Sequence, residues 1–490
     1  MRRTPTGWRR RHPALVLGAL LLVLGVTGCR GAEDTATPSD VADAPSDTPP
    51  AFVVSADLVH PDDFEYLGAF RLPDDAERPR TFAYGGQAMT HRASGDPDGP
   101  DDGFPGSLFV MGHNRLPYGE LPDGNQVAEI AIPAPVVSGS VAGLGQATFL
   151  QEFRDVAVGS FEALEELPRV GMEYLDRSET GPRIHLAWGQ HLQDEPRTQG
   201  ASHAHVSPDL SRPDLQGPWF IGERSLYSVN DYLFEIPAEW AELYADGRYL
   251  ATGRFRDGGW SGMSPALYAY RPWTADGTPA PPGSRLDELS LLEYAKSDET
   301  DRIERCIDGY QHPDEWSGGA WLTADSGTSA VMFAGTKGTG ERYWYGYVNP
   351  AGPDEPCVER EMIGQFPLCR LADGTPCPDE ASLTCPDHTS ERGWWSSRFE
   401  ARLTLYDPSD LARVATGQFE PHEPQPYAYL TIDEHLFGNP SNVEPEMLGT
   451  GVQRRYRLGD VAFDRANGLI YVLELFADEA RPVVHVWRVR

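Results

Sequence analysis

Residues 459–473 read GDVAFDRANGLIYVL, which is two short apolar runs joined by the dipeptide Asn467-Gly468. Both runs contain the branched and aromatic residues that favour β-strands. The Asn-Gly dipeptide favours the tight type I′ turn of a β-hairpin. This segment therefore predicts two adjacent antiparallel strands, the first of which follows a glycine.

The same order of events recurs along the chain. A glycine-rich apolar segment comes first, at residues 85–89, 171–175, 317–321 and 459–463. A second apolar run follows after a turn, at residues 107–112, 183–189, 330–335 and 469–473. Repetition of one supersecondary unit is the sequence signature of propellers and other repeat folds.

Further strand signals complete each unit. Residues 127–133 and 403–408 are predicted third strands that end in proline, and residues 147–154 and 249–256 are predicted fourth strands. Four antiparallel strands per unit indicate the blades of an all-β propeller. Helical patterns are scarce, and only residues 237–244 and 409–414 favour short helices.

We expect five blades. The tripeptide Trp-Ser-Gly occurs at residues 260–262 and again at residues 316–318, a spacing that would also allow a sixth blade. Residues 64–71 look like a fourth strand without a blade of its own, and the chain ends on the apolar run 483–488. We therefore expect strands from the two ends to complete one blade together. A β-sandwich, or a pair of them, is the competing fold.

The repeats span residues 51–490, and this part of the chain resembles poorly characterised exported β-propeller proteins of bacteria. The resemblance is one of architecture. It implies a fold and no activity, because the same fold carries many unrelated functions.

The first residues have the features of an export signal. Five arginines precede the apolar run 14–26, which is shorter than the roughly 20 residues of a membrane-spanning helix. The sequence Val26-Thr27-Gly28-Cys29 resembles the lipobox of bacterial lipoproteins. The resemblance implies a signal peptide at 1–28, cleavage before Cys29 and lipidation of Cys29, with acyl chains such as palmitate. An ordinary secretory signal with an incidental cysteine is the alternative.

Residues 29–50 predict a disordered tether, because they contain Thr, Ser, Asp, Ala and Pro with almost no large apolar side chain. We therefore expect a protein anchored in the cell envelope, outside the cytoplasm. Arg30 stands where an aspartate would signal retention in the inner membrane, which favours the outer membrane if the organism has one.

The chain is strongly acidic, with a formal net charge of −33 at pH 7. Nucleic acids are therefore poor partners, because phosphate binding requires the opposite sign. Contact with the membrane is expected only through the lipid anchor.

Four cysteines lie close together, namely Cys357, Cys369, Cys377 and Cys385. In an exported protein this cluster predicts two disulfides that staple an insertion at residues 351–392, with three possible pairings. The spacing does not match the paired C-x-x-C motifs of a structural zinc site. Cys306 lies outside the cluster and is expected to be a buried thiol.

In a propeller, the start of each inner strand and the exit of each second strand meet at one end of the central channel. Five carboxylates stand at or near predicted inner-strand starts, namely Glu173, Asp231, Asp257, Glu315 and Asp460, with Trp260 and Trp316 beside two of them. His113, His191, Lys337 and Glu474 stand at predicted second-strand exits. We therefore expect one rim to collect the chemistry-bearing side chains.

Carboxylates beside tryptophan rings serve either in glycan chemistry or in the structure of the fold. A pair of carboxylates can supply the acid and the base or nucleophile of glycosidic-bond hydrolysis. The same residue types also cap backbone N–H groups at strand ends, and tryptophans pack between sheets. We expect a module that binds a glycan or an envelope protein, with a glycan hydrolase and a structural envelope scaffold as alternatives.

No cofactor or metal site is predicted with any strength. His203 and His205 point the same way on a strand, but no third ligand is evident. The acidic loop at residues 96–102 offers oxygen ligands for calcium, although it lacks the EF-hand spacing and its prolines restrict wrapping.

Overall fold

The computed structural model divides the chain into two units, Met1–Phe52 and Val53–Arg490. All described residues belong to the second unit. They are residues 57–73, 78–96, 99, 102–112, 125–160, 169–189, 200–226, 228–229, 231–256, 263–295, 305–311, 313–344, 359–363, 366–370 and 394–490. Cys29, the predicted tether, Cys357, Cys377 and Cys385 therefore lie outside the described residues, as does the side chain of Cys369.

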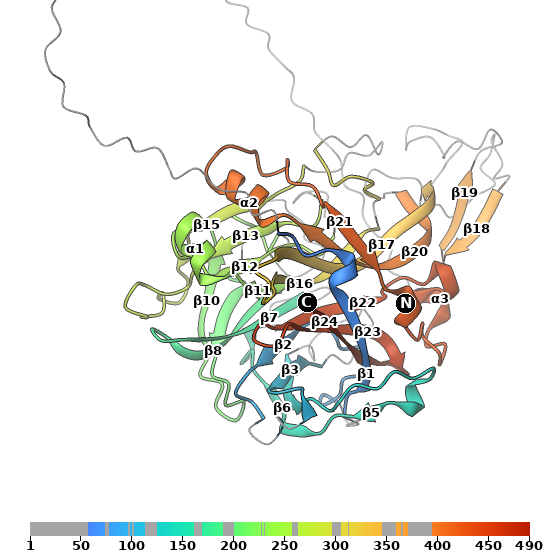
Figure 1. Ribbon diagram of the computed structural model, residues 1–490, viewed down its shortest axis with the longest axis horizontal. Coiled ribbons are helices and arrows are strands. Elements are labelled where there is room, and N and C mark those ends of the chain that lie inside the picture. Colours follow the sequence, from blue (N-terminus) through green and yellow to red (C-terminus); the bar gives the residue numbers. More distant parts are fainter. Residues whose placement is uncertain are drawn as a thin grey trace, which may run out of the picture. The chain divides into compact units, whose positions relative to one another are not determined.

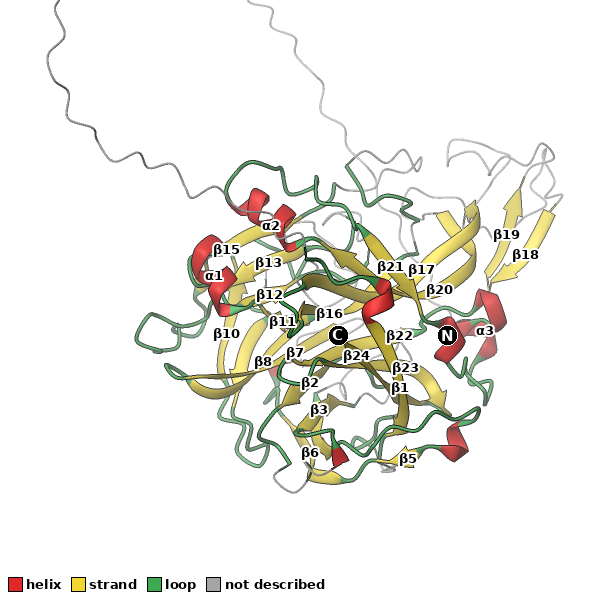
Figure 2. Cartoon of the chain, in the orientation of Figure 1, coloured by secondary structure: helices red, strands yellow, loops and turns green. Residues whose placement is uncertain are grey.

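The second unit is a five-bladed β-propeller (Figures 1 and 2), as the repeats predicted. One blade is built from both ends of the unit. From the centre outward it contains β22 (Leu458–Asp464), β23 (Leu469–Asp478), β24 (Arg481–Val489), β1 (Phe64–Arg71) and the short β5 (Gly145–Gln146).

The other four blades follow in chain order. The first contains β2 (Met89–Arg92), β3 (Ser107–Met111), β4 (Gln126–Ala131) and β6 (Phe149–Asp155). The second contains β7 (Arg169–Arg177), β8 (Gly181–Gly189), β9 (His203–Val206), β10 (Gln216–Ile221) and β14 (Arg285–Leu286). The third contains β11 (Leu233–Glu235), β12 (Leu250–Thr252), β13 (Leu267–Tyr270) and β15 (Glu288–Leu292). The fourth contains β16 (Glu315–Thr323), β17 (Ser329–Trp344), β20 (Trp394–Tyr406) and β21 (Ala428–Thr431), and its β17 also pairs with β19 (Phe366–Arg370), which pairs with β18 (Glu359–Ile363).

Short helices connect these strands. They are α1 (Ala238–Tyr244), α2 (Pro408–Ala415), α3 (Pro445–Leu448) and the single 3₁₀ turns η1 (Pro61–Asp63), η3 (Val141–Gly143), η5 (Asp433–His435) and η6 (Gly451–Gln453). The two predicted helices correspond to α1 and α2. The second begins where Asp407 accepts a hydrogen bond from the backbone N–H of Ser409 and Pro408 occupies the first turn. No helix among the described residues has the length and apolarity that crossing a membrane requires.

The predicted closure is confirmed. β1 pairs antiparallel with β24, with Phe64 opposite Val489 and Arg71 opposite Val483. The inner strands β2, β7, β11, β16 and β22 contact one another in that cyclic order, and β22 contacts β2 to close the ring. A sixth blade is not formed by the described residues.

One predicted strand is misplaced. Residues 249–256 were expected to form a fourth strand, but they contain β12, which is the second strand of its blade and pairs with β11 and β13. The inner strand of this blade, β11, has only three residues and no glycine-rich segment, so its sequence signal is weak. Arg256 therefore follows the second strand of its blade, β12, and does not stand at the start of an inner strand.

The glycine-rich segments have a packing reason. A Cβ atom on Gly171 of β7 would lie 2.0 Å from the carbonyl oxygen of Asp231, just before β11. A Cβ on Gly318 of β16 would lie 2.7 Å from the backbone nitrogen of Val461 on β22. With only five blades, neighbouring inner strands approach backbone to backbone, and glycine permits that approach.

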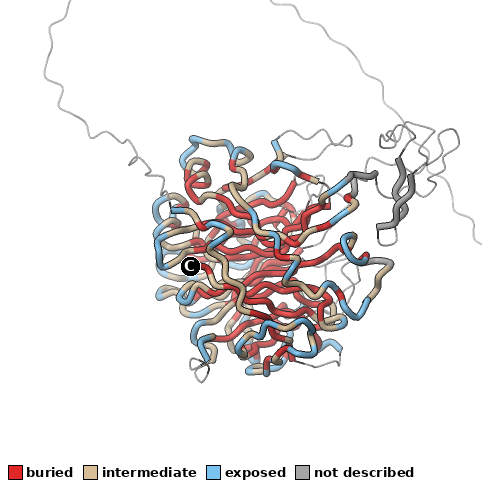
Figure 3. The backbone as a smooth tube through the Cα atoms, turned by 45° about the vertical axis from the view of Figure 1, so that its right-hand side comes forward, coloured by how far each residue is buried: buried red, intermediate tan, exposed pale blue. Residues whose placement is uncertain are grey.

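Buried residues run through the interior of this unit (Figure 3), and each large apolar cluster combines side chains of neighbouring blades. Alternate side chains of each strand face the two neighbouring sheets, so the strands are buried on both faces. Leu108 and Val110 of β3, for example, pack in one cluster with Tyr471 and Leu473 of β23. Hydrophobic burial therefore holds the blades side by side around the ring.

Candidate functional site

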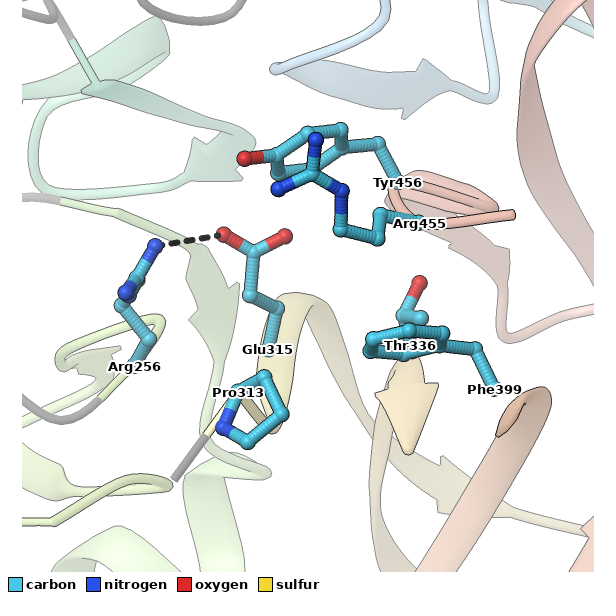
Figure 4. A pocket seen from close by; sticks show the side chains of 7 residues that line it. All are labelled: Arg256, Pro313, Glu315, Thr336, Phe399, Arg455 and Tyr456. Carbon is cyan, nitrogen blue, oxygen red and sulfur yellow. Dashed lines mark ion pairs between the residues drawn. The ribbon is translucent and has the colours of Figure 1, made fainter. Parts of the chain in front are cut away.

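A pocket lies where β16 begins, at the meeting of three blades (Figure 4). The space between its walls, counted together with the open solvent at its mouth, is approximately 200 Å³. We call it the Glu315 pocket, and its lining residues are Arg256, Pro313, Glu315, Thr336, Phe399, Arg455 and Tyr456. They come from the exit of β12, the start of β16, the strands β17 and β20, and the segment just before β22.

Strand pairing places two of these side chains together. Glu315 on β16 is the register partner of Thr336 on β17, so their side chains emerge on the same side of the blade. Arg256 forms a β-bridge with Glu315, and the backbone N–H of Trp316 donates to the carbonyl of Phe255 at 2.6 Å. The end of β12 is thus joined directly to the start of β16.

The opposite wall is formed by Arg455 and Tyr456. Tyr456 has φ +52°, in the left-handed region that a residue with a bulky side chain rarely adopts. The backbone on both sides is held, because Arg455 N–H donates to the Leu448 carbonyl at 2.7 Å and Arg457 N–H donates to Thr336 Oγ1 at 2.9 Å. Such held, strained residues concentrate at ligand sites and switch regions.

The charges of the pocket are largely removed from solvent. The side chain of Arg256 is 7% exposed and that of Glu315 is 6% exposed. Arg256 Nη1 lies 3.7 Å from Glu315 Oε1, which is an ion pair beyond hydrogen-bonding distance. Figure 4 shows the Glu315 carboxylate between the guanidinium groups of Arg256 and Arg455. The seven lining residues thus include two guanidinium groups and one carboxylate, and an ion pair joins Glu315 to Arg256.

Of the three other described carboxylates at predicted inner-strand starts, Asp231 and Asp460 are fully buried and Glu173 is half-buried. Burial, together with the charge of Glu235, raises the pKa of Glu173 to about 8. Burial also raises the pKa of Asp460 well above its usual range, and the charges of Asp231 and Glu173 add to this shift. These three carboxylates therefore lie near one another around the inner strands.

Two of these acids hold neighbouring inner strands together. Glu173 lies in the middle of β7 rather than at its start, and it accepts hydrogen bonds from Thr90 Oγ1 on β2 at 2.9 Å and from Glu235 N–H on β11 at 3.1 Å. Asp460 accepts from the backbone N–H of Met89 on β2 at 2.7 Å. Their contacts are those of residues that join blades.

Lys337 and Trp316 lie next to pocket residues but point away from the pocket. Successive side chains of a strand alternate between the two sides of the sheet. Thr336 and Glu315 therefore face the pocket, while the adjacent Lys337 and Trp316 point to the opposite side. Lys337 Nζ donates to the carbonyls of Gly309 and Gly338 at 2.8 and 2.9 Å and pairs with Asp314 at 3.0 Å. Trp316 is 1% exposed and packs in the core.

Glu474 belongs to a buried network. It accepts hydrogen bonds from the backbone N–H groups of Phe437 and Gly438 at 2.8 and 2.7 Å, and it pairs with Arg454 at 3.2 Å and His485 at 3.0 Å. Burial alone would raise the pKa of Glu474, but the hydrogen bond and charge of His485 and the charge of Arg454 outweigh burial and lower it. Its contacts fix the loop after β21 against the blade formed by both ends.

The remaining predicted rim residues, His113, His191, Asp257 and Trp260, lie outside the described residues. Most of the acidic loop 96–102 does so too; in its described part, Asp102 Oδ1 accepts the backbone N–H of Phe104 at 2.8 Å. Cys306 is half-buried at the edge of the core, so its predicted burial is only partial.

A third histidine does join His203 and His205. The register of β8 and β9 places His185 opposite His205, with ring centroids 5.4 Å apart. Burial lowers the pKa of His203 to about 3 and that of His205 to about 4, so both rings are neutral. No group of three His, Cys, Asp or Glu side chains in the described part of the chain is placed to hold a metal ion.

The sequence indicated part of the pocket and missed the rest. Glu315 stands at the start of an inner strand, and residue 336 stands where the second strand was expected to end, so both were expected at this rim. Arg256 also stands at a second-strand exit, because β12 is the second strand of its blade. Arg455 and Tyr456 stand just before the start of the inner strand β22. A correct order of strands in the β11 blade would therefore have pointed to Arg256.

The comparisons with known proteins give no assignment. No protein-family model matches the chain, and no curated protein matches it. The features of the chain that bear on its function are therefore the propeller fold and the Glu315 pocket.

Proposed function

We propose that this chain is an exported, lipid-anchored β-propeller that binds a glycan in the Glu315 pocket. The observation that carries the proposal is the pocket itself, where charged, hydroxyl and aromatic side chains of three blades converge. Ligand sites are typically concave, with apolar walls and a few well-placed polar groups. Phe399 and Tyr456 supply ring surfaces, and Thr336 and the two arginines supply polar atoms.

The lining favours binding over hydrolysis. Hydrolysis of a glycosidic bond normally uses two carboxyl groups about 5 to 10 Å apart on either side of the bond. The described lining contributes one carboxylate, Glu315, whereas Glu173 and Asp460 serve as acceptors for neighbouring blades. A structural envelope scaffold remains the other alternative, and it predicts no retained ligand.

The binding proposal is tested with the full mature chain on an array of bacterial and plant glycans. We expect a retained glycan that is lost when Thr336→Trp fills the pocket and kept in Asp276→Asn, a change at a fully exposed position. Turnover of the retained glycan, abolished by Glu315→Gln or Asp257→Asn, would establish the hydrolase instead. Binding of an envelope protein in place of any glycan, or of no ligand, would contradict the proposal.

The anchoring proposal rests on the resemblance of Val26-Thr27-Gly28-Cys29 to a lipobox. Cells that express the full chain are labelled with a clickable palmitate analogue, and their membranes are separated by density. We expect label and membrane association in the wild type and in Cys306→Ala, and loss of both in Cys29→Ala. Membrane association that persists in Cys29→Ala would overturn the anchor.

A further inference from the structure

We propose that residues 439–453, which we call the Glu444 loop, form a gate that opens and closes the Glu315 pocket. The inference rests on the proposed function, because it describes how a glycan reaches that site. Inside the pocket, the centre of a water-sized sphere can move through only about 10 Å³, which is room for one water molecule. The conformation in Figure 4 is therefore the closed one, and a sugar ring enters only after a wall has moved.

One wall of the pocket is better placed to move than the others. Four lining residues are held by strand pairing or by a β-bridge, namely Arg256, Glu315, Thr336 and Phe399. Arg455 and Tyr456 instead follow the short helices α3 and η6 and precede β22. Because lids and binding loops are drawn from segments that open more cheaply than core strands, this wall is the one that moves.

Both ends of the Glu444 loop are fastened at one buried residue, Glu474. Its carboxylate accepts the backbone N–H groups of Phe437 and Gly438, just before the loop, at 2.8 and 2.7 Å. It also pairs with Arg454, just after the loop, at 3.2 Å. Compact surface loops whose ends lie close together are Ω-loops, which are often functional. The Glu444 loop can therefore move as a unit while Glu474 keeps its ends in place.

A side-chain hydrogen bond latches the loop to the body of the propeller. Tyr84 Oη donates to Glu444 Oε1 at 2.8 Å. Burial and this hydrogen bond raise the pKa of Tyr84 to about 12, so the hydroxyl group keeps the proton that it donates. The backbone of Tyr84 is itself held, because its N–H donates to the Ala480 carbonyl at 2.7 Å. The latch therefore opens by movement of the loop.

The loop is joined to the pocket wall through Leu448. This residue is fully buried, in one apolar cluster with Tyr456, Leu475 and Phe476. Its carbonyl accepts the backbone N–H of Arg455 at 2.7 Å. Withdrawal of Leu448 thus removes a backbone partner from Arg455 and a packing neighbour from Tyr456, which are the two residues of the wall.

The closed loop has a strained backbone. Asn439, Asn442 and Glu444 have φ values of +57°, +53° and +44°, in the left-handed region. Such conformations persist only where the surrounding contacts enforce them, and they concentrate at ligand clamps and switch regions. Loss of the Tyr84–Glu444 contact should therefore shift the loop toward its open form.

Access to the pocket is measured in the full mature chain with Thr336→Cys and a methanethiosulfonate reagent that carries a glucose residue. The introduced thiolate attacks the reagent sulfur, a disulfide forms and methanesulfinate leaves, and peptide mass spectrometry locates the label. We expect Tyr84→Phe in this background to accelerate labelling at position 336 about 3- to 10-fold, as loss of one hydrogen bond implies. Glu444→Ala cuts the same latch from the loop side and should act equally.

The matched control is Tyr249→Phe, which removes the hydrogen bond of another tyrosine to a glutamate, Glu242, and should leave labelling unchanged. Hydrogen exchange then identifies the moving segment. Tyr84→Phe should accelerate exchange in residues 439–456 and leave the amides of β22 unchanged. Equal acceleration in β22 would mean general destabilisation and would overturn the gate.

The outcomes separate the two proposals. Equal labelling rates with and without the Tyr84–Glu444 contact overturn the gate, while the proposed function stands if the glycan array retains a ligand that Thr336→Trp abolishes. Accelerated labelling with no glycan retained by the wild type or by Tyr84→Phe supports the gate and overturns the proposed function. If both hold, Tyr84→Phe should bind the retained glycan more tightly than the wild type, because more of the chain is open.

Discussion

Gly459 packs against Gly86 so closely that a Cβ atom on Gly459 would lie 2.0 Å from the Gly86 carbonyl oxygen. The two residues belong to neighbouring blades, and the backbone N–H of Asp460 donates to the same carbonyl at 3.0 Å. This contact closes the ring between β22 and the segment that leads into β2. Close approach of backbones therefore decides the size of the propeller's centre.

Gly459→Ala should destabilise the propeller by about 1–3 kcal/mol, because the added methyl group meets backbone that cannot rotate away. Gly139→Ala is the matched control, since no atom lies within 4 Å of its Cβ position. Urea denaturation measures both. Equal midpoints for the two variants would show that the inner strands can separate at no cost.

Removal of β1 should unfold the closing blade. Ala69 and Phe70 are fully buried, and β1 supplies the antiparallel partner of β24 along its length. A chain that begins at Leu72 exposes that edge to aggregation, whereas a chain that begins at Val53 keeps every described strand. We expect the shorter chain to aggregate or melt at a much lower temperature in size-exclusion and thermal unfolding experiments. A monomer with unchanged melting temperature would contradict the role of β1 in closure.

Glu173 should make the propeller less stable at high pH. Its pKa is about 8 in the folded chain, against an ordinary value of 4.5. The folded state therefore holds a proton that the unfolded chain releases, and the free energy of unfolding falls as pH rises from 4.5 to 8. Each unit of pKa difference corresponds to about 1.4 kcal/mol.

The Glu173→Gln variant tests this dependence, because glutamine keeps an acceptor for Thr90 and loses the titration. From pH 5 to pH 9 the wild type should lose unfolding free energy relative to the variant, because only the wild type has the Glu173 carboxyl group to titrate. Glu152→Gln, at an exposed position of β6, should show a constant difference. A constant difference for Glu173→Gln as well would mean that the carboxylate is ionised in the folded chain.

Lys337 and Asp314 should prove energetically coupled. Asp314 is fully buried, and burial raises its pKa although the Lys337 charge opposes the shift. Lys337→Met leaves the carboxylate without its cation and should cost about 3–5 kcal/mol. The double variant Lys337→Met/Asp314→Asn should lose less unfolding free energy than the two single variants lose together. Arg212→Ala, in an exposed pair with Asp209, should change stability by less than about 1 kcal/mol, and additive losses at the buried pair would refute the coupling.

The blades could be predicted because their signals are local. Runs such as 107–112 and 469–473 show strand composition, turns and spacing within a few residues, and burial on both faces preserves that pattern. The β11 blade was predicted wrongly because its inner strand has three residues and lacks the glycine that marks the others. Its position is decided by contacts with β7 and β16 and not by its own sequence.

The pocket could be predicted only in part. The alternation of side chains placed Glu315 at a strand start, but nothing local distinguishes Thr336, which faces the pocket, from Lys337, which faces Asp314. Register decides between them. The buried roles of Glu173 and Asp460 were likewise hidden, since their hydrogen-bond donors lie on other blades.

The sequence by itself determined that this chain forms repeated four-stranded blades and that strands from both ends complete one of them. Strand propensity and apolar spacing act between near neighbours, so they can be read along the chain. Only the tertiary structure decided which side chains line the Glu315 pocket. Arg256, Glu315 and Arg455 are brought to one pocket by three blades, and they meet only when the ring closes.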